Sequence, residues 1–347
     1  MISVKVTIKE IAERAGVHRA TVDKVLHDRP GVSDEVRQQI KQLIKELDYT
    51  PNPAGRILQR QGKVYRLAVI LCEVDATPFL KEGVELGVRK QSNFDIEITY
   101  YTTGFQEAAK QSQIILDAVK DAVDGIILSP INSDQVRKAI NYAASKGIPV
   151  VTANSDIPGS KRLRFVGQDG EHASRIAGRL MGLLLNGKGN IAVISSSIDS
   201  ENNNYFVSIR EQGFRKFIAE EYPDIRIAAC VESFEDPNIT YQLTKELIGK
   251  YPDLSGIYIT CGGVSEVGRA LRETGKGDSL RVISYEDYPD ILKLVREGII
   301  DVTLTSDITR QGNIPVQVLM NKLIFDELPE SDCIFTESKI LVKESID

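Results

Sequence analysis

The sequence has few of the residues from which metal sites and disulfide frameworks are built. It holds four cysteines and three histidines among 347 residues. Cys72, Cys230, Cys261 and Cys333 lie far apart and form no C-x-x-C pair, which argues against a zinc site and a disulfide framework. The histidines show no metal-ligating spacing such as H-E-x-x-H. We therefore expect no metal and no cofactor.

Long apolar runs are missing as well. None reaches the roughly 18 residues that a bilayer-spanning helix needs. The opening segment, MISVKVTIKEIAERAG, is interrupted by charges every few residues and lacks the apolar core of a secretory signal. These features predict a soluble protein of the cytoplasm without a membrane partner.

The chain does have length, an ordinary globular composition and an uneven charge. Its 347 residues exceed the usual size of one domain, and its 42% hydrophobic and 27% charged residues are typical of globular proteins. The net charge is −6, yet residues 1–63 hold 12 Lys or Arg against 8 Asp or Glu. The basic N-terminal part is where a polyanion would bind, although solvated basic faces are common.

The first helix is predicted from its end signals. Thr7-Ile8-Lys9-Glu10 has the pattern of a capping box, in which Thr7 and Glu10 satisfy each other's backbone amides. Gly16 would end the helix in a left-handed turn conformation. A sharp turn is therefore expected between this helix and the next.

Two more helices complete the N-terminal pattern. The second, about residues 18–27, would turn Val22 and Val25 toward the first helix. The third would be capped by Ser33 and carry one apolar stripe, formed by Val36, Ile40, Leu43, Ile44 and Leu47. The spacing is that of a DNA-binding helix-turn-helix, but these positions alone also fit a three-helix bundle that binds nothing.

A short basic segment after Tyr49 favours the DNA-binding interpretation. The run TPNPAGRILQ supplies an Asn cap and a proline at the first helical position. A helix of under three turns is marginal on its own, so we expect it to depend on a partner.

Residues 6–60, from VTIKEIAERAG to NPAGRILQR, resemble the headpiece and hinge of the lactose-repressor (LacI/GalR) family. In that family the second helix enters the major groove. The DNA-binding positions that the resemblance implies are Thr7, His18, Arg19, Ala20, Thr21, Asp23, Lys24 and His27 in the headpiece, and Asn52, Ala54, Arg56 and Leu58 in the hinge. These types suit the role, because Arg can pair with guanine O6 and N7 and an Ala methyl can meet a thymine methyl.

Two of these positions have alternative interpretations. Asp23 stands where the family usually has a hydroxyl residue, and it either accepts from cytosine N4 or pairs with Arg19, which is the favoured alternative. Leu58, nine residues after Tyr49, matches the family's leucine wedge in the minor groove. Its alternative role is a core contact.

From Tyr65 onward, buried-strand segments alternate with helical patterns. The segments are residues 65–72, 96–101, 124–130 and 148–154 in a first series, and 189–197, 225–231, 254–261, 279–285 and 301–306 in a second. Two such series predict an α/β domain in which doubly wound parallel sheets form two lobes.

Residues 64–343 resemble the type I periplasmic sugar-binding-protein fold, the usual partner of this headpiece. The expected organisation is a helix-turn-helix headpiece over 1–50, a hinge over 51–63 and an effector domain over 64–347. Within the effector domain, the N-lobe is expected at about 64–165 and 289–313, and the C-lobe at about 166–288 and 314–347.

Ligands of open α/β sheets collect at the carboxyl ends of the strands. The effector-binding positions that the resemblance implies there are Asp75, Thr77, Phe79, Asn154, Ser155, Asp156, Arg210, Thr260, Glu286 and Ser306. Arg210, Glu286 and Phe79 are the leading candidates. Thr260-Cys261-Gly262 replaces the family's common Asn-Asp, and Glu286 replaces an Asp, so the ligand need not be a simple sugar.

Together these features predict a transcription regulator, by family habit a repressor, controlled allosterically by a small molecule such as a carbohydrate. Its partners would be an inverted-repeat DNA operator and a second copy of the chain, because one headpiece offers little contact area. A transport binding protein would need a secretory signal and no headpiece. An enzyme is disfavoured because the chain lacks G-x-S-x-G, a P-loop and a histidine near the cleft loops.

Overall fold

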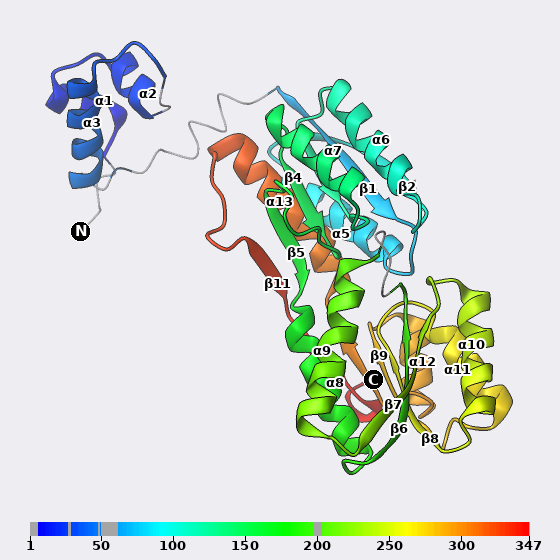
Figure 1. The fold of residues 1–347 in the computed structure, drawn as a ribbon. Helices are drawn as coiled ribbons and strands as arrows, with labels where there is room; N and C mark the ends of the chain where they lie inside the picture. The colour runs from blue at the N-terminus through cyan, green and yellow to red at the C-terminus, as the bar shows by residue number, and fades with distance from the viewer. Residues whose placement is uncertain (1–5, 27–28, 48, 50–61, 198–202, 347) are drawn as a thin grey trace. The chain divides into compact units, whose positions relative to one another are not determined.

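The computed structural model describes residues 6–26, 29–47, 49, 62–197 and 203–346. The chain divides into two compact units, residues 1–61 and 62–347. The described residues of the first unit form the helices α1 (Ile8–Ala15), α2 (Arg19–Leu26) and α3 (Asp34–Glu46) (Figure 1). The hinge positions fall outside the described residues.

The predicted ends of α1 are confirmed. The Thr7 hydroxyl accepts from the Glu10 amide at 3.3 Å, and the Glu10 carboxylate accepts from the Thr7 amide at the same distance. Gly16 has a φ of +64°, the left-handed conformation that its lack of a Cβ permits. Ser33 lies at the N-cap of α3, but its side chain makes no capping hydrogen bond, so that part of the prediction was wrong. The acidic residues Asp34 and Glu35 in the first turn of α3 still stabilise the helix, because they interact favourably with the positive end of its dipole.

One small core holds the three helices together. Ile11, Val22 and Ile40, one from each helix, are completely buried. The predicted apolar stripe of α3 packs on this core, so the periodicity identified the correct face. Helix α2 contributes Val22, Val25 and Leu26 to this core and leaves Arg19, Ala20 and Lys24 exposed.

The second unit is built on two six-stranded sheets, one in each lobe. In order across the first sheet, the strands are β11 (Cys333–Thr336), β5 (Arg164–Gln168), β4 (Val150–Ala153), β3 (Gly125–Leu128), β1 (Val64–Cys72) and β2 (Asp95–Thr103). In the second they are β12 (Lys339–Leu341), β10 (Val302–Thr305), β9 (Arg281–Tyr285), β8 (Leu254–Ile259), β6 (Gly189–Ser195) and β7 (Ile225–Glu232). Every pairing is parallel except that of β10 with β12.

Helices cover both faces of each sheet (Figure 1). Those of the first lobe are α5 (Thr77–Lys90), α6 (Ala108–Lys120), α7 (Asp134–Ser145) and α13 (Ile308–Phe325). Those of the second are α8 (Gly170–Leu184), α9 (Tyr205–Glu221), α10 (Pro237–Lys250), α11 (Val264–Thr274) and α12 (Pro289–Arg296), and a short 3₁₀ turn, η1 (Lys343–Ser345), lies near the chain end. Alternate residues of β1 serve opposite layers: Val69 packs in the layer of α5 and α13, and Ile70 in that of α6 and α7. The predicted doubly wound α/β architecture is confirmed.

The predicted lobe boundaries near the C-terminus were wrong. Residues 289–305 belong to the second lobe, because β10 pairs with β9. Helix α13 belongs to the first lobe, where it packs on α5, and β11 then adds to the first sheet before β12 returns to the second. The chain thus passes between the lobes three times, after β5, β10 and β11.

No helix in the described part of the chain has the length and apolar character to cross a membrane.

Candidate ligand pocket and DNA-reading helix

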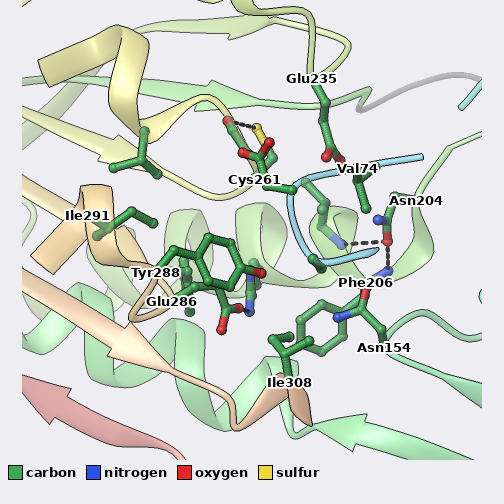
Figure 2. Close-up of a pocket in the computed structure, with 17 residues that line it drawn as sticks. Val74, Asn154, Asn204, Phe206, Glu235, Cys261, Glu286, Tyr288, Ile291 and Ile308 are labelled. Carbon is green, nitrogen blue, oxygen red and sulfur yellow. Dashed lines mark hydrogen bonds and ion pairs between the residues drawn. The ribbon is translucent and has the colours of Figure 1, made fainter. Parts of the chain in front are cut away.

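A pocket opens where the carboxyl ends of strands from both lobes meet (Figure 2). It has about 520 Å³ of empty space, including its mouth. Its lining residues are Val74, Asp75, Ala76, Asn154, Asn204, Phe206, Val207, Arg210, Glu235, Cys261, Gly262, Val264, Tyr285, Glu286, Tyr288, Ile291 and Ile308. This mixture of aromatic faces, carboxylates and one guanidinium suits a small polar ligand that also has C–H surface.

Arg210, from α9, is 5% exposed and anchors the pocket wall. It donates to the Thr260 carbonyl at 3.0 Å, to Gln168 Oε1 at 2.7 Å and to Glu286 Oε1 at 3.2 Å. Its guanidinium lies 3.5 Å from the centre of the Tyr285 ring. Its Nε has no hydrogen-bond partner among the described residues. A buried donor without an acceptor is uncommon in proteins.

Glu286 follows β9 and adopts a φ of +74°, which is uncommon for a residue with a side chain. The Ser306 hydroxyl lies 3.0 and 2.8 Å from its two carboxylate oxygens, and Thr303 donates to its carbonyl at 2.7 Å. Burial raises the pKa of Glu286, and Arg210 opposes that rise. Ser306 and Arg210 therefore fix the carboxylate at the pocket.

Asp75 and Glu235 approach the pocket from different lobes. Asp75 follows β1 and accepts from the Gly263 amide of the second lobe at 3.2 Å. Glu235 follows β7 with a φ of +57°. Burial, and secondarily the charge of Asp75, raise the pKa of Glu235 to about 7. The sequence prediction missed Glu235, although its position just past a strand end is the feature that identified the other candidates.

Four of the ten predicted effector positions line the pocket: Asp75, Asn154, Arg210 and Glu286. Of the rest, Ser306 and Thr260 contact the lining residues through the hydrogen bonds given above. Phe79 stacks on Tyr288 with ring centres 4.3 Å apart, and of these two rings only that of Tyr288 lines the pocket. Phe79 therefore supports the wall instead of forming it.

The other three predicted positions have local partners. Thr77 donates to the Cys72 carbonyl at 2.5 Å and accepts from the Val74 amide at 3.0 Å, which fixes the turn from β1 into α5. Asp156 forms a buried ion pair with Arg162. Ser155 donates to Asn204 at 3.0 Å across the lobes. These contacts account for their side chains without a ligand.

Further polar contacts join the two lobes. Asn132 and Asn203 form an isolated antiparallel bridge, and their side-chain amides are 2.9 Å apart. Gln168, which accepts from Arg210, donates to the Thr305 carbonyl and to Ser338, and these bonds link all three interlobe segments. The lobes are thus held in contact around the pocket.

Helix α2 of the first unit exposes the side chains that the resemblance assigns to DNA. His18, Arg19, Ala20 and Lys24 are exposed, and Thr21 is half-buried. Asp23 pairs with Arg29 at 3.4 Å, so among the described residues its partner is not the predicted Arg19. The assignments to His27, Asn52, Ala54, Arg56 and Leu58 lie outside the described residues.

Comparison with known proteins assigns both units. Residues 7–52 match the family described as bacterial regulatory proteins, lacI family, and residues 71–327 match the periplasmic binding protein domain. The chain belongs to the lacI family of bacterial regulators. Its C-terminal unit is a periplasmic binding protein domain. The whole chain is a DNA-binding transcription regulator with a sugar-binding-protein-like domain.

Relatives include the transcriptional repressor PurR of Histophilus somni (strain 129Pt), 25% identical over 81% of this chain and 82% of that protein. The NTD biosynthesis operon regulator NtdR of Bacillus subtilis (strain 168) is 34% identical over 39% of this chain and 41% of that protein. Among solved structures, a solute-binding protein of an ABC transporter from Burkholderia graminis, in complex with D-arabinose, has a TM-score of 0.74 and 26% identity, covering 81% of this chain and 96% of that chain.

Proposed function

We propose that α2 reads an operator in the major groove and that a small, sugar-like molecule in the interlobe pocket sets the affinity for that operator. The supporting observation is that α2 commits Val22 and Val25 to the core while leaving Arg19 exposed at its N-terminal end. An arginine there can form the bidentate contact with guanine that distinguishes base pairs in the major groove.

The proposed regulator represses transcription as a homodimer on an inverted repeat. One headpiece buries too little surface for selective binding, and two copies related by a twofold axis match a repeated half-site. The ligand assignment draws on the pocket's polar ring and on the relationship to a protein crystallised with D-arabinose. It requires binding and a change of conformation, and no covalent step.

Selection of binding sites from random duplexes, followed by gel shifts at fixed salt, tests the DNA part of the proposal. Wild-type protein is expected to enrich an inverted repeat. Arg19→Ala should weaken binding to it by about 10- to 100-fold and relax the preference at one base pair in each half-site. Lys45→Ala, which removes one exposed charge from α3, is the matched control and should enrich the same sequence. Failure of the wild type to enrich any sequence would contradict the proposal.

A further inference from the structure

The pocket carries more negative than positive charge. Its lining includes the carboxylates of Asp75, Glu235 and Glu286, and Arg210 is the only Lys or Arg among the lining residues that the structure describes. Arg210 and Ser306 already compensate Glu286. Asp75 and Glu235 are therefore left facing the pocket without a cationic side chain between them.

These two carboxylates converge on one small volume. Asp75 Oδ2 and Glu235 Oε2 lie 3.0 and 3.2 Å from the position that a Cβ on Gly262 would occupy. Because residue 262 is a glycine, that volume is not filled by a side chain. Two like charges so close in a partly desolvated site repel each other, which agrees with the raised pKa of Glu235.

The repulsion between these two carboxylates acts between the two lobes. Asp75 belongs to the first lobe and Glu235 to the second, so closing the pocket brings their charges together. A cation between them would turn this repulsion into attraction to both lobes. A neutral ligand could relieve it only by leaving a proton on one carboxyl group.

A different set of groups faces the rest of the pocket. The unpartnered Nε of Arg210 needs an acceptor, and the Glu286 carboxylate can accept from a ligand hydroxyl. The rings of Phe206, Tyr285 and Tyr288 offer apolar faces. Hydrogen-bonding groups and aromatic faces beside two carboxylates suit an organic cation that also carries hydroxyls and C–H surface.

We propose that the ligand of this pocket is a polyhydroxylated amine, such as an amino sugar, whose ammonium group lies between Asp75 and Glu235 while its hydroxyls meet Arg210 and Glu286. This inference rests on the proposed function, because it names the chemical class of the ligand that the pocket takes.

Calorimetric titration of the full chain with matched pairs of ligands tests the charge requirement. The probes are D-glucosamine, D-galactosamine and D-mannosamine, each beside its neutral parent hexose and its N-acetyl derivative. At least one amine should bind 10-fold or more tightly than both neutral partners. Its binding near pH 7 should also release protons, because the ammonium group lowers the pKa of Glu235. Repeating the titration in buffers of different ionisation enthalpy measures that release.

Substitutions locate the cation. Glu235→Gln keeps the size and removes the charge, so it should reduce amine binding by about 10- to 100-fold and abolish proton release. Asp75→Asn should also weaken the amine. Glu82→Gln, at an exposed position of α5, is the control and should bind like the wild type. Circular dichroism checks that each variant is folded.

Three results would overturn the inference: neutral hexoses binding as tightly as the amines, no binding by any amine, or equal stabilisation by Ca²⁺ or Mg²⁺ alone. None of these affects operator selection by the headpiece, which is measured without ligand. Loss of the proposed function and loss of this inference are therefore distinguishable.

Discussion

Arg210 illustrates how one residue can serve both the fold and the ligand. Desolvating a guanidinium costs several kcal/mol, and the cost is offset only when its donors are satisfied. Here Thr260, Gln168 and Glu286 satisfy the two terminal nitrogens, and Tyr285 covers the guanidinium face. Among the described residues, only Nε of this guanidinium lacks a hydrogen-bond partner, and the other contacts fix the orientation of the side chain before any ligand binds.

Glu235 gives a stability prediction that needs no ligand. Its pKa is raised from 4.5 to about 7 in the folded chain, so the folded state holds a proton that the unfolded state has lost. The stability from this group is full below about pH 4.5 and is lost as the pH rises through about 7. We therefore compare the free energy of unfolding of Glu235→Gln with that of the wild type at two pH values. The difference, variant minus wild type, should be larger at pH 8 than at pH 5 by up to about 3 kcal/mol.

Urea unfolding of both proteins at pH 5, 6, 7 and 8 measures that difference. Glu82→Gln controls for the loss of one carboxylate at an exposed position. A wild-type curve parallel to that of Glu235→Gln across this range would show that the Glu235 pKa is not raised in the free protein.

At the same scale, the sequence could suggest side chains near the pocket but not their orientation. The rule that residues after strands approach the ligand correctly placed Asp75, Asn154 and Glu286 in the pocket lining. It did not separate Phe79 from Tyr288, because which ring faces the pocket depends on their stacking across the lobes. Glu235 was open to the same rule and was overlooked.

At the scale of elements, the contact of α5 with α13 depends on two glycines. A Cβ on Gly83 would lie 2.0 Å from the Thr309 carbonyl oxygen, and one on Gly312 would lie 2.2 Å from that of Leu80. Both obstacles are backbone atoms, which cannot rotate away. The two helices are therefore as close as their backbones allow, and α13 is held on the first lobe between two of the interlobe segments.

Gly312→Ala should therefore destabilise the protein by about 3 kcal/mol despite the better helix propensity of alanine. Gly249→Ala, in the last turn of α10, is the matched control. Apart from the neighbouring backbone of its own helix, no atom lies within 4 Å of its added Cβ, so it should be neutral or stabilising by up to about 1 kcal/mol. Thermal and urea unfolding compare the two. Equal effects would show that the α5 and α13 backbones can separate at little cost.

The elements themselves were largely predictable, and their assignment to lobes was not. Long apolar strands such as β1 and β6 stand out because both faces of a parallel sheet are buried. Strands β5, β11 and β12 were missed, being three to five residues long and partly polar. The lobe to which a C-terminal strand or helix belongs depends on contacts with residues distant in the sequence. The local sequence pattern does not contain this information, and α13 and β10 were therefore assigned to the wrong lobes.

At the scale of the whole molecule, backbone strain gathers around the pocket. Non-glycine residues with positive φ in this region are Asn154, Phe234, Glu235, Glu286 and Asp307. Each such residue costs of the order of 1 to 3 kcal/mol and persists only where its surroundings enforce it. Asn154, Glu235 and Glu286 line the pocket, and Asp307 caps α13 directly after an interlobe segment. The strained residues therefore lie at the pocket and at a connection between the lobes.

This arrangement predicts reciprocal coupling between ligand and operator. If a ligand changes operator affinity 100-fold, the differential free energy is about 2.7 kcal/mol, and saturating operator DNA must change ligand affinity by the same factor with the same sign. Fluorescence anisotropy of labelled operator with and without ligand gives one factor, and calorimetry of ligand with and without operator gives the other.

Replacing Asn132 with Ala removes one interlobe contact and should reduce both factors together. Asn190→Ala, whose exposed amide contacts Asp253 within the second lobe, should leave them unchanged. Unequal factors in the wild type would mean that the two sites do not share one conformational equilibrium.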